Sequence, residues 1–350
     1  MKALFKKLSI DPRFSISIGF LLSISIFMLN AIAPSLFPSY YIYIVISLIT
    51  FFIFAGIDFE VLRLFSKHLY VASVILLLVT LIIGQATRGT IRWIPIGGLS
   101  FQPAEIVRPF LILFFADFLT VMNFNIKRVI KAIILLFIPS FLILVQPSLS
   151  VTVLLGVGFF GVILANDFDK KNILAGIGIF LLLMPVFWFL LKPYQQDRII
   201  NFATPSKDPL GAGYNAVQSM IAVGSGKIFG RTLGKGIQTQ LAFLPEKQTD
   251  FIFAAIAEEL GLLGASILLL SVFLLFWRLS VFMQKAINPV ARAYLSGIFL
   301  TLFVQVFVHV GMNMGLLPIA GLPFPLVSAG GSSLLATSIG LGIALRAYRR

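Results

Sequence analysis

The sequence predicts an all-α polytopic membrane protein with about ten transmembrane helices, folded as one integral membrane domain over residues 1–350. Of the 350 residues, 59% are hydrophobic and only 11% are charged, and the mean hydropathy is +1.02. A water-soluble domain of this composition would be unable to cover its own apolar surface. Apolar runs long enough to cross the hydrocarbon core of a bilayer also recur along the chain. Membrane lipids are therefore its expected surroundings.

Proline and polar residues divide the apolar sequence into separate helices. The first run follows a lysine-rich start and is longer than the apolar core of a signal peptide, so we interpret it as a membrane helix. Pro34 and Pro38 separate it from the second, Gln146-Pro147-Ser148 separates the fifth from the sixth, and further prolines precede the last. The expected helices are 14–33, 40–57, 69–85, 105–120, 130–146, 149–165, 172–191, 251–277, 292–312 and 326–346.

The net charge of +14 is distributed as membrane topology signals rather than as a nucleic-acid surface. Lys and Arg form short clusters between apolar runs, where they set orientation and contact lipid headgroups. An arrangement with both termini in the cytoplasm places most of them inside. The remainder lie mainly in two outer segments, 86–104 and 192–250, and the second forms a large extracytoplasmic loop between helices 7 and 8. These outer cations indicate an anionic ligand at the outer face.

Residue types suited to a resident metal ion are scarce. The chain has no cysteine, and His68 and His309 are its only histidines. A histidine-based metal site is therefore not expected, and the sequence shows no other ligand set.

The loop 192–250 contains glycines that alternate with basic and polar residues, among them Lys235 and Gln238. Glycines beside cations allow backbone amides and positive charge to approach a phosphate together. The alternative is a flexible loop with ordinary turn glycines, because no spacing here matches a nucleotide-binding loop.

The outer segment before the fourth helix, and the start of that helix, carry further charges. Arg88 and Arg92 are expected near the outer headgroups, with Trp93 as an interfacial anchor. Glu105 and Arg108 are three residues apart at a helix start and can pair on one face. A paired charge inside a membrane is usually structural, and a substrate role for the pair is the secondary alternative.

Asp250 stands at the boundary between a polar loop and an apolar helix. Ionisable groups at such a boundary are costly, so they are candidates for function. The alternative is a helix start, with Thr249 as the cap and Asp250 stabilised by the helix dipole. Glu258 and Glu259, two turns deeper, need internal partners. We expect them to form a buried polar network, with Arg92 and Arg108 as candidate partners.

The C-terminal third contains a stretch rich in glycine and proline, 311–333, within a region free of Asp, Glu, Lys and Arg. Non-helical backbone at membrane depth is tolerated only where it is buried in protein or lines a cavity. The stretch therefore predicts a cavity wall. Small residues that permit close helix packing are a compatible explanation.

These segments together resemble the SEDS family (shape, elongation, division and sporulation), and they occur in the family's order. The matching pieces are Arg92-Trp93-Ile94, Gly98 to Glu105, Gly211 to Tyr214 with Gln218-Ser219, Gly224 to Gly226, Leu244 to Gly261 and Gly311 to Ser333. The resemblance implies a ten-helix peptidoglycan glycosyltransferase that polymerises lipid II at the outer face of the bacterial cytoplasmic membrane. It also implies a class B penicillin-binding protein as partner. The family's essential aspartate falls on Asp250.

The stretch Gly-Gly-Leu-Ser-Phe-Gln-Pro is more similar to the RodA branch, which acts in elongation and cell shape, than to the FtsW division branch. The chain departs from the family at three positions. Arg108 replaces the usual lysine and keeps the charge with a different shape. Gln248 stands where histidine is usual, so no His–Asp relay is expected, and Ala329 replaces a frequent tyrosine.

The reaction that the resemblance implies accounts for a single essential carboxylate among cations. Lipid II carries its sugar α-linked to pyrophosphate and the polymer is β-linked, so one displacement inverts the anomeric carbon. Such a displacement requires one base for the attacking hydroxyl, and a pyrophosphate leaving group needs cations rather than a second acid. We assign the base to Asp250. Pyrophosphate-binding residues would be Arg92, followed by Arg88, Arg108 and Lys235, and Gln238 is a further candidate for binding the substrate. No tightly bound cofactor is expected, although a divalent Mg²⁺ or Mn²⁺ ion would suit the pyrophosphate.

Two alternatives come from other functional classes. A lipid II transporter would also use polytopic helices, a broken segment and intramembrane charges, but the outer charges lie away from the midplane and no inverted repeat is evident. A scaffold for division proteins is the other alternative. An FtsW-like division polymerase remains open within the family.

Overall fold

The computed structural model describes residues 11–87, 90–120, 126–166, 171, 178, 188–189, 191–204 and 212–349. The chain packs into two compact units, each assembled from segments distant in sequence. Unit 1 comprises Met1–Asn166, Ser266–Val306 and Leu322–Arg350, and unit 2 comprises Asp167–Ala265 and Phe307–Gly321. The expectation of a single membrane domain remains a prediction, because packing into units does not test it.

Each expected membrane helix that falls within the described residues is present. The helices are α2 (Pro12–Ile32), α3 (Ser39–Gly56), α5 (Ser66–Ile83), α6 (Pro103–Thr120), α7 (Ile126–Val145), α8 (Leu149–Leu164), α13 (Ile252–Lys285), α14 (Pro289–Asn313) and α15 (Gly331–Ala347). Six of them are long and apolar enough to cross a membrane, and α8 and α15 are shorter apolar helices. The expected helix 172–191 lies almost wholly outside the described residues. The mostly helical fold class is therefore confirmed.

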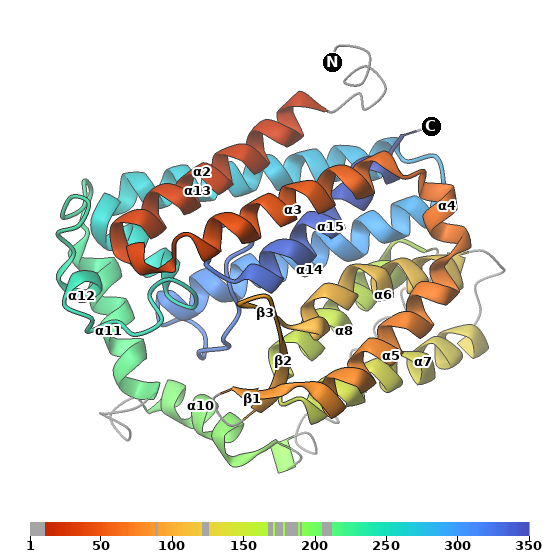
Figure 1. Cartoon of the computed structure of the whole chain (residues 1–350), viewed down its shortest axis with the longest axis horizontal. Coiled ribbons are helices and arrows are strands. Elements are labelled where there is room, and N and C mark those ends of the chain that lie inside the picture. The colour runs from red at the N-terminus through yellow and green to blue at the C-terminus, as the bar shows by residue number, and fades with distance from the viewer. Residues whose placement is uncertain are drawn as a thin grey trace. The chain divides into compact units, whose positions relative to one another are not determined.

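Helix α15 forms the centre of unit 1 and lies alongside α3 (Figure 1). All of its residues from Ser332 to Leu345 are buried. Glycine, alanine, serine and threonine on several faces allow this, because small side chains let neighbouring helices approach closely. A Cβ atom added at Gly342 would stand 2.7 Å from the carbonyl oxygen of Phe51 on α3. The helix is thus specified by small residues rather than by one apolar face.

Helix α15 begins five residues later than the sequence predicts. The segment before it forms a turn rather than helix, and Leu326 in this turn has a φ of 63°. The hydroxyl of Ser328 accepts a hydrogen bond from the Phe324 N–H at 2.7 Å, and Ser25 donates to the carbonyl of Val327 at 2.7 Å. These bonds satisfy backbone groups that a helix would otherwise have paired.

A small antiparallel sheet in unit 1 was not anticipated from the sequence. It consists of β1 (Gln85–Thr87), β2 (Thr90–Ile96) and β3 (Leu99–Phe101), in that order. Gly97 and Gly98 form the two-residue turn between β2 and β3, with φ values of 57° and 80°. Both positive values match the primed turns that hairpins prefer. The segment that carries Arg92 and Trp93, expected near the outer headgroups, therefore forms a hairpin strand.

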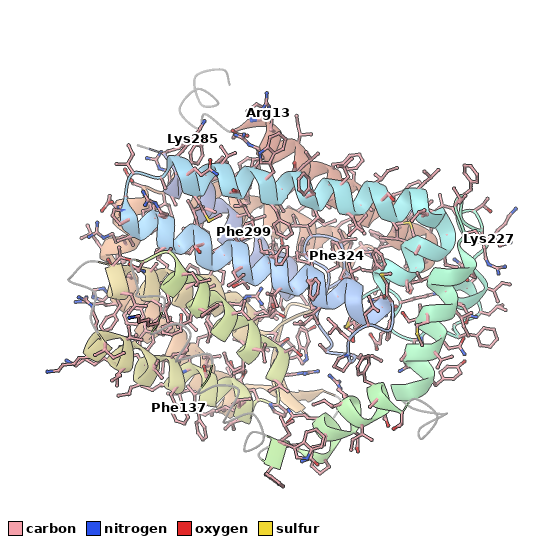
Figure 2. All side chains as sticks on the ribbon, turned by 180° about the vertical axis from the view of Figure 1, so that it is seen from behind. Arg13, Phe137, Lys227, Lys285, Phe299 and Phe324 are labelled. Carbon is pink, nitrogen blue, oxygen red and sulfur yellow. The ribbon has the colours of Figure 1, made fainter. Side chains whose placement is uncertain are left out.

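The surface of unit 1 matches a lipid environment. Figure 2 shows Phe137 on the outside of α7, where 67% of the residue is exposed, whereas Phe324 is buried. Arg13 and Lys285, which the arrangement with both termini in the cytoplasm places on the inside, lie near each other in the same view. Ring contact between Phe14 and Phe282, with centroids 5.0 Å apart, joins the helices that carry them. The side of the membrane that they face remains a prediction.

Unit 2 contains α10 (Pro193–Ala203), α11 (Ala212–Ser225), α12 (Ile237–Gln240) and the start of α13, which is broken at Gly261. Gly261 adopts a φ of 69° and a ψ of −165°, a conformation that favours glycine. The loop 226–231 fills the break with its own backbone. The N–H of Leu262 donates to the Lys227 carbonyl at 2.8 Å. The Arg231 N–H donates to the carbonyl of Glu258 at 2.9 Å.

The loop approaches the broken helix so closely that glycine is required in it. A Cβ atom at Gly226 would stand 1.8 Å from the carbonyl oxygen of Ala257, and one at Gly230 would stand 2.2 Å from that of Glu259. The expected helix 251–277 contained no such break. Gly226 and Gly230, for which the sequence suggested ordinary turns or a phosphate cradle, therefore have a packing role.

Candidate active site

Asp250 lies in a tight turn of unit 2, two residues before α13 begins. The turn is built on the carbonyl of Glu246, which accepts from the N–H groups of Thr249 at 3.0 Å and Phe251 at 3.3 Å. The hydroxyl of Thr249 also donates to Glu246, at 3.0 Å to its carboxylate. Asp250 is half-buried. The carboxylate is therefore accessible yet carried by a defined piece of main chain.

The main chain on both sides of the helix start is held by the side chain of Asn313, the last residue of α14. Its Oδ1 accepts from the Ala254 N–H at 3.0 Å, and its Nδ2 donates to the Asp250 carbonyl at 3.0 Å. The sequence had offered only Thr249 as a cap for this helix. The structure shows an amide side chain from a segment 63 residues away capping the helix, whereas the Thr249 hydroxyl donates to Glu246.

Arg198 of α10 lies close to the carboxylate of Asp250. Both border Gly321, which has a φ of 64°. A Cβ atom added there would stand 3.6 Å from Arg198 Nη1 and 3.8 Å from Asp250 Oδ2. The two charged side chains therefore face one small space, which is open because residue 321 has no side chain. An acid and a cation arranged in this way can bind an anion and accept a proton beside it.

A shallow pocket adjoins this corner of unit 2. It has about 390 Å³ of space, part of which is open to solvent. Its lining is apolar apart from Arg198 and Asn201; the remaining residues are Phe202, Ala216, Met220, Gly315, Leu317, Pro318 and Ile319. Arg198 Nη1 donates to the carbonyl of Ile319 at 3.5 Å, which directs the guanidinium along the pocket edge. A cation beside an apolar surface suits an amphiphilic anion.

Glu258 and Glu259 are fully buried and hold the loop that precedes Asp250. Glu258 accepts from the N–H groups of Gln238 at 2.8 Å and Thr239 at 3.0 Å. Glu259 accepts from the Gly234 N–H at 3.0 Å and from the Thr239 hydroxyl at 3.1 Å. The sequence had offered arginines as partners. The bonds described here run instead to loop 234–240, so these carboxylates order a loop.

Lys247 closes this network from the other side. It donates to the carbonyl of Thr239. Partial burial lowers the pKa of Lys247, and the nearby charges of Glu259 and Glu258 act in the opposite direction. Burial has the larger effect because it removes water from the ammonium group.

The remaining candidate ligands in unit 2 lie on the anchored loop. Lys235 is exposed. Gln238 is half-buried and is tied through its N–H to Glu258, while its side-chain Oε1 is buried without a hydrogen-bond partner among the described residues. Their roles as substrate ligands remain predictions.

Other candidate residues belong to unit 1. Glu105 and Arg108 form a buried ion pair at 3.6 Å, and Arg108 Nη2 donates to Gln305 at 3.4 Å. Arg92 and Trp93 are half-buried on β2. Arg88 lies outside the described residues. The ion pair between Glu105 and Arg108 occurs as the sequence predicts. The substrate roles of Arg88, Arg92 and Arg108 remain predictions.

Sequence reasoning missed Arg198 and Asn313. Arg198 lies on α10, a short helix that begins at Pro193. This helix was not predicted, because it falls within the segment 192–250 that was interpreted as a loop. Asn313 is a polar residue within the region that lacks Asp, Glu, Lys and Arg. A polar amide in such surroundings is the signal that could have identified it. Among the described residues, no three His, Cys, Asp or Glu side chains are grouped to hold a metal ion.

Comparison with known proteins gives one consistent result. A family model described as "Cell cycle protein", covering FtsW, RodA and SpoVE, matches residues 14–350. The chain is 37% identical over 305 residues to the peptidoglycan glycosyltransferase MrdB of Escherichia coli, covering 86% of this chain and 82% of that protein. It is 35% identical over 288 residues to the probable peptidoglycan glycosyltransferase FtsW of Idiomarina loihiensis, covering 80% and 70%.

Two solved structures share the fold. One is a chain from a study of how a peptidoglycan synthase complex coordinates polymerization and crosslinking. It is 30% identical with a TM-score of 0.82, and 97% of each chain is covered. The other is an aspartate-to-alanine mutant of the rod shape determining protein RodA from Thermus thermophilus. It is 25% identical with a TM-score of 0.74, again with 97% of each chain covered.

Proposed function

Because this chain belongs to the FtsW/RodA/SpoVE family of cell cycle proteins, we propose that it is a peptidoglycan glycosyltransferase that polymerises lipid II into glycan strands. The family resemblance drawn from its motifs is thereby confirmed. The glycosyltransferase names of MrdB and FtsW support the activity. The 37% identity to MrdB and the RodA neighbour favour the branch that acts in cell shape.

The observation that carries the proposed chemistry is the placement of Asp250 and Arg198 around Gly321. In the proposed reaction, a hydroxyl oxygen of one sugar attacks the anomeric carbon of another. The bond from that carbon to pyrophosphate breaks, and the configuration is inverted. The hydroxyl proton passes to Asp250 and the pyrophosphate departs as an anion beside Arg198. One base and one cation satisfy these needs, because pyrophosphate leaves without protonation.

The adjoining pocket supports the same substrate class. Lipid II joins a phosphate-linked sugar to a long hydrocarbon chain, and the pocket combines Arg198 with apolar residues such as Phe202 and Leu317. Lys235 and Gln238 of unit 2 are further candidate contacts for the pyrophosphate or the sugars. A divalent Mg²⁺ or Mn²⁺ ion that accompanies the pyrophosphate belongs to the proposal, and chelation tests it.

The proposed location is the bacterial cytoplasmic membrane, with the site on its extracytoplasmic side. The apolar helices of the chain and its similarity to RodA support a multi-pass membrane protein. A class B penicillin-binding protein is the proposed partner. The similar chain from a peptidoglycan synthase complex, in which polymerization and crosslinking are coordinated, supports this.

The test uses the purified full chain with fluorescent lipid II, with and without its penicillin-binding partner, analysed by gel. Wild-type protein should produce glycan polymer, and Asp250→Asn should abolish it. Asp58→Asn is the matched control, because Asp58 caps α4 (Phe59–Leu64) and asparagine caps equally well. Polymer from Asp250→Asn at the wild-type rate would overturn the base assignment. Transbilayer movement of lipid II without polymer would instead indicate a transporter, and neither activity would favour a scaffold.

A further inference from the structure

Asn313 is a fully buried amide at the point where the main chain of Asp250 meets α14. Its side chain makes three hydrogen bonds to backbone groups. Oδ1 accepts from the Ala254 N–H at 3.0 Å, and Nδ2 donates to the carbonyls of Asp250 at 3.0 Å and His309 at 2.7 Å. One planar group thus connects the end of one helix to the start of another.

The chemistry of these partners allows only an amide in this orientation. The Ala254 N–H requires an acceptor, whereas the two carbonyls require a donor, so exchange of oxygen and nitrogen would oppose like groups. Leucine has a similar volume and offers neither function. Ionised aspartate keeps the acceptor but turns negative charge toward two carbonyl oxygens. Asparagine is therefore required by the arrangement of the backbone.

A second contact holds Asn313 itself in place. The hydroxyl of Ser219 on α11 donates to the Asn313 carbonyl at 2.9 Å, and Ser219 is fully buried. Three segments of unit 2 therefore meet at this residue: α11, the end of α14 and the start of α13. The position of the Asp250 backbone depends on all three.

The bonds from Asn313 reach the main chain of Asp250 and not its carboxylate. Asp250 lies in a turn that precedes the helix, and the side chain of Asn313 is a long-range contact of its carbonyl. A misplacement of about 1 Å in a reacting group can reduce a rate on the order of 100-fold. We propose that Asn313 is a positioning residue, which fixes the Asp250 main chain so that the carboxylate faces the space beside Gly321 and Arg198. This inference rests on the proposed function.

Helix capping and core stability provide the alternative explanation, in which Asn313 only keeps unit 2 folded. The two roles differ in what they change. A stability role lowers the melting temperature and the fraction of folded enzyme. A positioning role lowers kcat in folded enzyme, leaves KM unchanged, and acts only through Asp250.

The experiment compares Asn313→Leu and Asn313→Asp with the wild type in the full chain, using fluorescent lipid II and monodisperse folded protein well below its melting temperature. Tyr70→Phe is the matched control, because it removes one side-chain bond to a distant backbone carbonyl, that of Leu135 at 2.8 Å, in unit 1. We expect Asn313→Leu to lower kcat about 10- to 100-fold with KM within about twofold, and Tyr70→Phe to retain kcat.

Asn313→Asp adds a pH signature and a second folded variant. A protonated aspartic acid at position 313 regains one donor, so the kcat of Asn313→Asp relative to wild type should rise as the pH falls. The ratio for Asn313→Leu should stay flat. An unchanged kcat in folded Asn313→Leu, a loss explained by KM, or an equal loss in Tyr70→Phe would each overturn the proposal.

A double-mutant cycle separates this inference from the proposed function. Asp250→Glu should have a similar residual rate with and without Asn313→Leu. Once the carboxylate of residue 250 is displaced, Asn313 has no correctly placed base to hold. Additive losses would show that Asn313 acts independently of Asp250. If Asp250→Asn alone kept the wild-type rate, the assignment of Asp250 as base would fail, whereas the absence of polymer from the wild-type protein would overturn the proposed function.

Discussion

Asp250 and Arg198 flank the same glycine, with Oδ2 of Asp250 and Nη1 of Arg198 3.8 Å and 3.6 Å from the point where a Cβ of Gly321 would stand. They come from separate segments of unit 2: Asp250 from the turn before α13 and Arg198 from α10. A short segment after α14 supplies the glycine. The arrangement brings together a base, a cation and an open space, which are the parts that an inverting transfer from pyrophosphate requires.

Replacing Arg198 with alanine should impair polymerisation without unfolding the protein. A hydrogen bond between a guanidinium and a phosphate contributes about 1.5–3 kcal/mol, so kcat/KM should fall roughly 10- to 100-fold. Arg231→Ala is the control, because Arg231 is also an exposed arginine of unit 2. Steady-state kinetics with fluorescent lipid II measure both. Equal losses in the two variants would show a general charge effect rather than a local contact.

Adding a methyl group at Gly321 should reduce activity more than it reduces stability. Alanine at a φ of 64° is strained by about 1–2 kcal/mol, and its methyl group would occupy the space between Asp250 and Arg198. Gly97→Ala is matched for strain, since Gly97 has a φ of 57° and nothing within 4 Å of its added Cβ. Similar melting temperatures and an activity loss of about tenfold only in Gly321→Ala are expected. Equal activity of Gly321→Ala and Gly97→Ala would contradict the proposed site beside Gly321.

Glu258→Gln should destabilise the protein through the loop before Asp250. The carboxylate accepts two backbone N–H groups, and the amide that replaces it would turn one donor toward another. A loss of about 2–3 kcal/mol is expected, because hydrogen bonds to buried charges are among the stronger ones. Scanning fluorimetry gives the change in melting temperature, with the exposed Glu60→Gln as control. A stable but inactive Glu258→Gln enzyme would indicate a chemical role instead.

Lys247 should make stability depend on alkaline pH. Its folded-state pKa is lowered, chiefly by burial, whereas an unfolded lysine keeps a value near 10.5. Between these values the unfolded chain binds more protons, so the free energy of unfolding rises with pH from the lowered pKa toward 10.5. Lys247→Met should lack this rise. Denaturation of both proteins across that range measures the difference, and parallel curves would refute it.

The ion pair of Glu105 and Arg108 should be coupled in stability. Removing either charge by Glu105→Gln or Arg108→Met leaves the other buried and uncompensated, at a cost of about 3–5 kcal/mol. The double variant should recover much of that loss. Thermal unfolding tests the coupling, and polymerisation by the double variant tests a substrate role. Restored stability with activity still lost would assign the pair a substrate role as well.

The sequence alone determined the membrane helices, their order and the candidate base. Hydrophobic runs and prolines are local signals, so the bounds of α2, α3 and α14 follow from them within a few residues. The position of Asp250 between a polar loop and an apolar helix is likewise local. The order of the motifs was enough to indicate the family, and the family match over residues 14–350 confirms it.

The tertiary structure decided which side chains meet around Asp250. Arg198 reaches a carbonyl 121 residues away, and Asn313 one 63 residues away. No local pattern encodes such bonds, because they depend on how the chain returns to the same place. The break at Gly261 was hidden for the same reason, since its backbone partners come from a separate loop. Local chemistry thus marked the acid, and long-range packing supplied its neighbours.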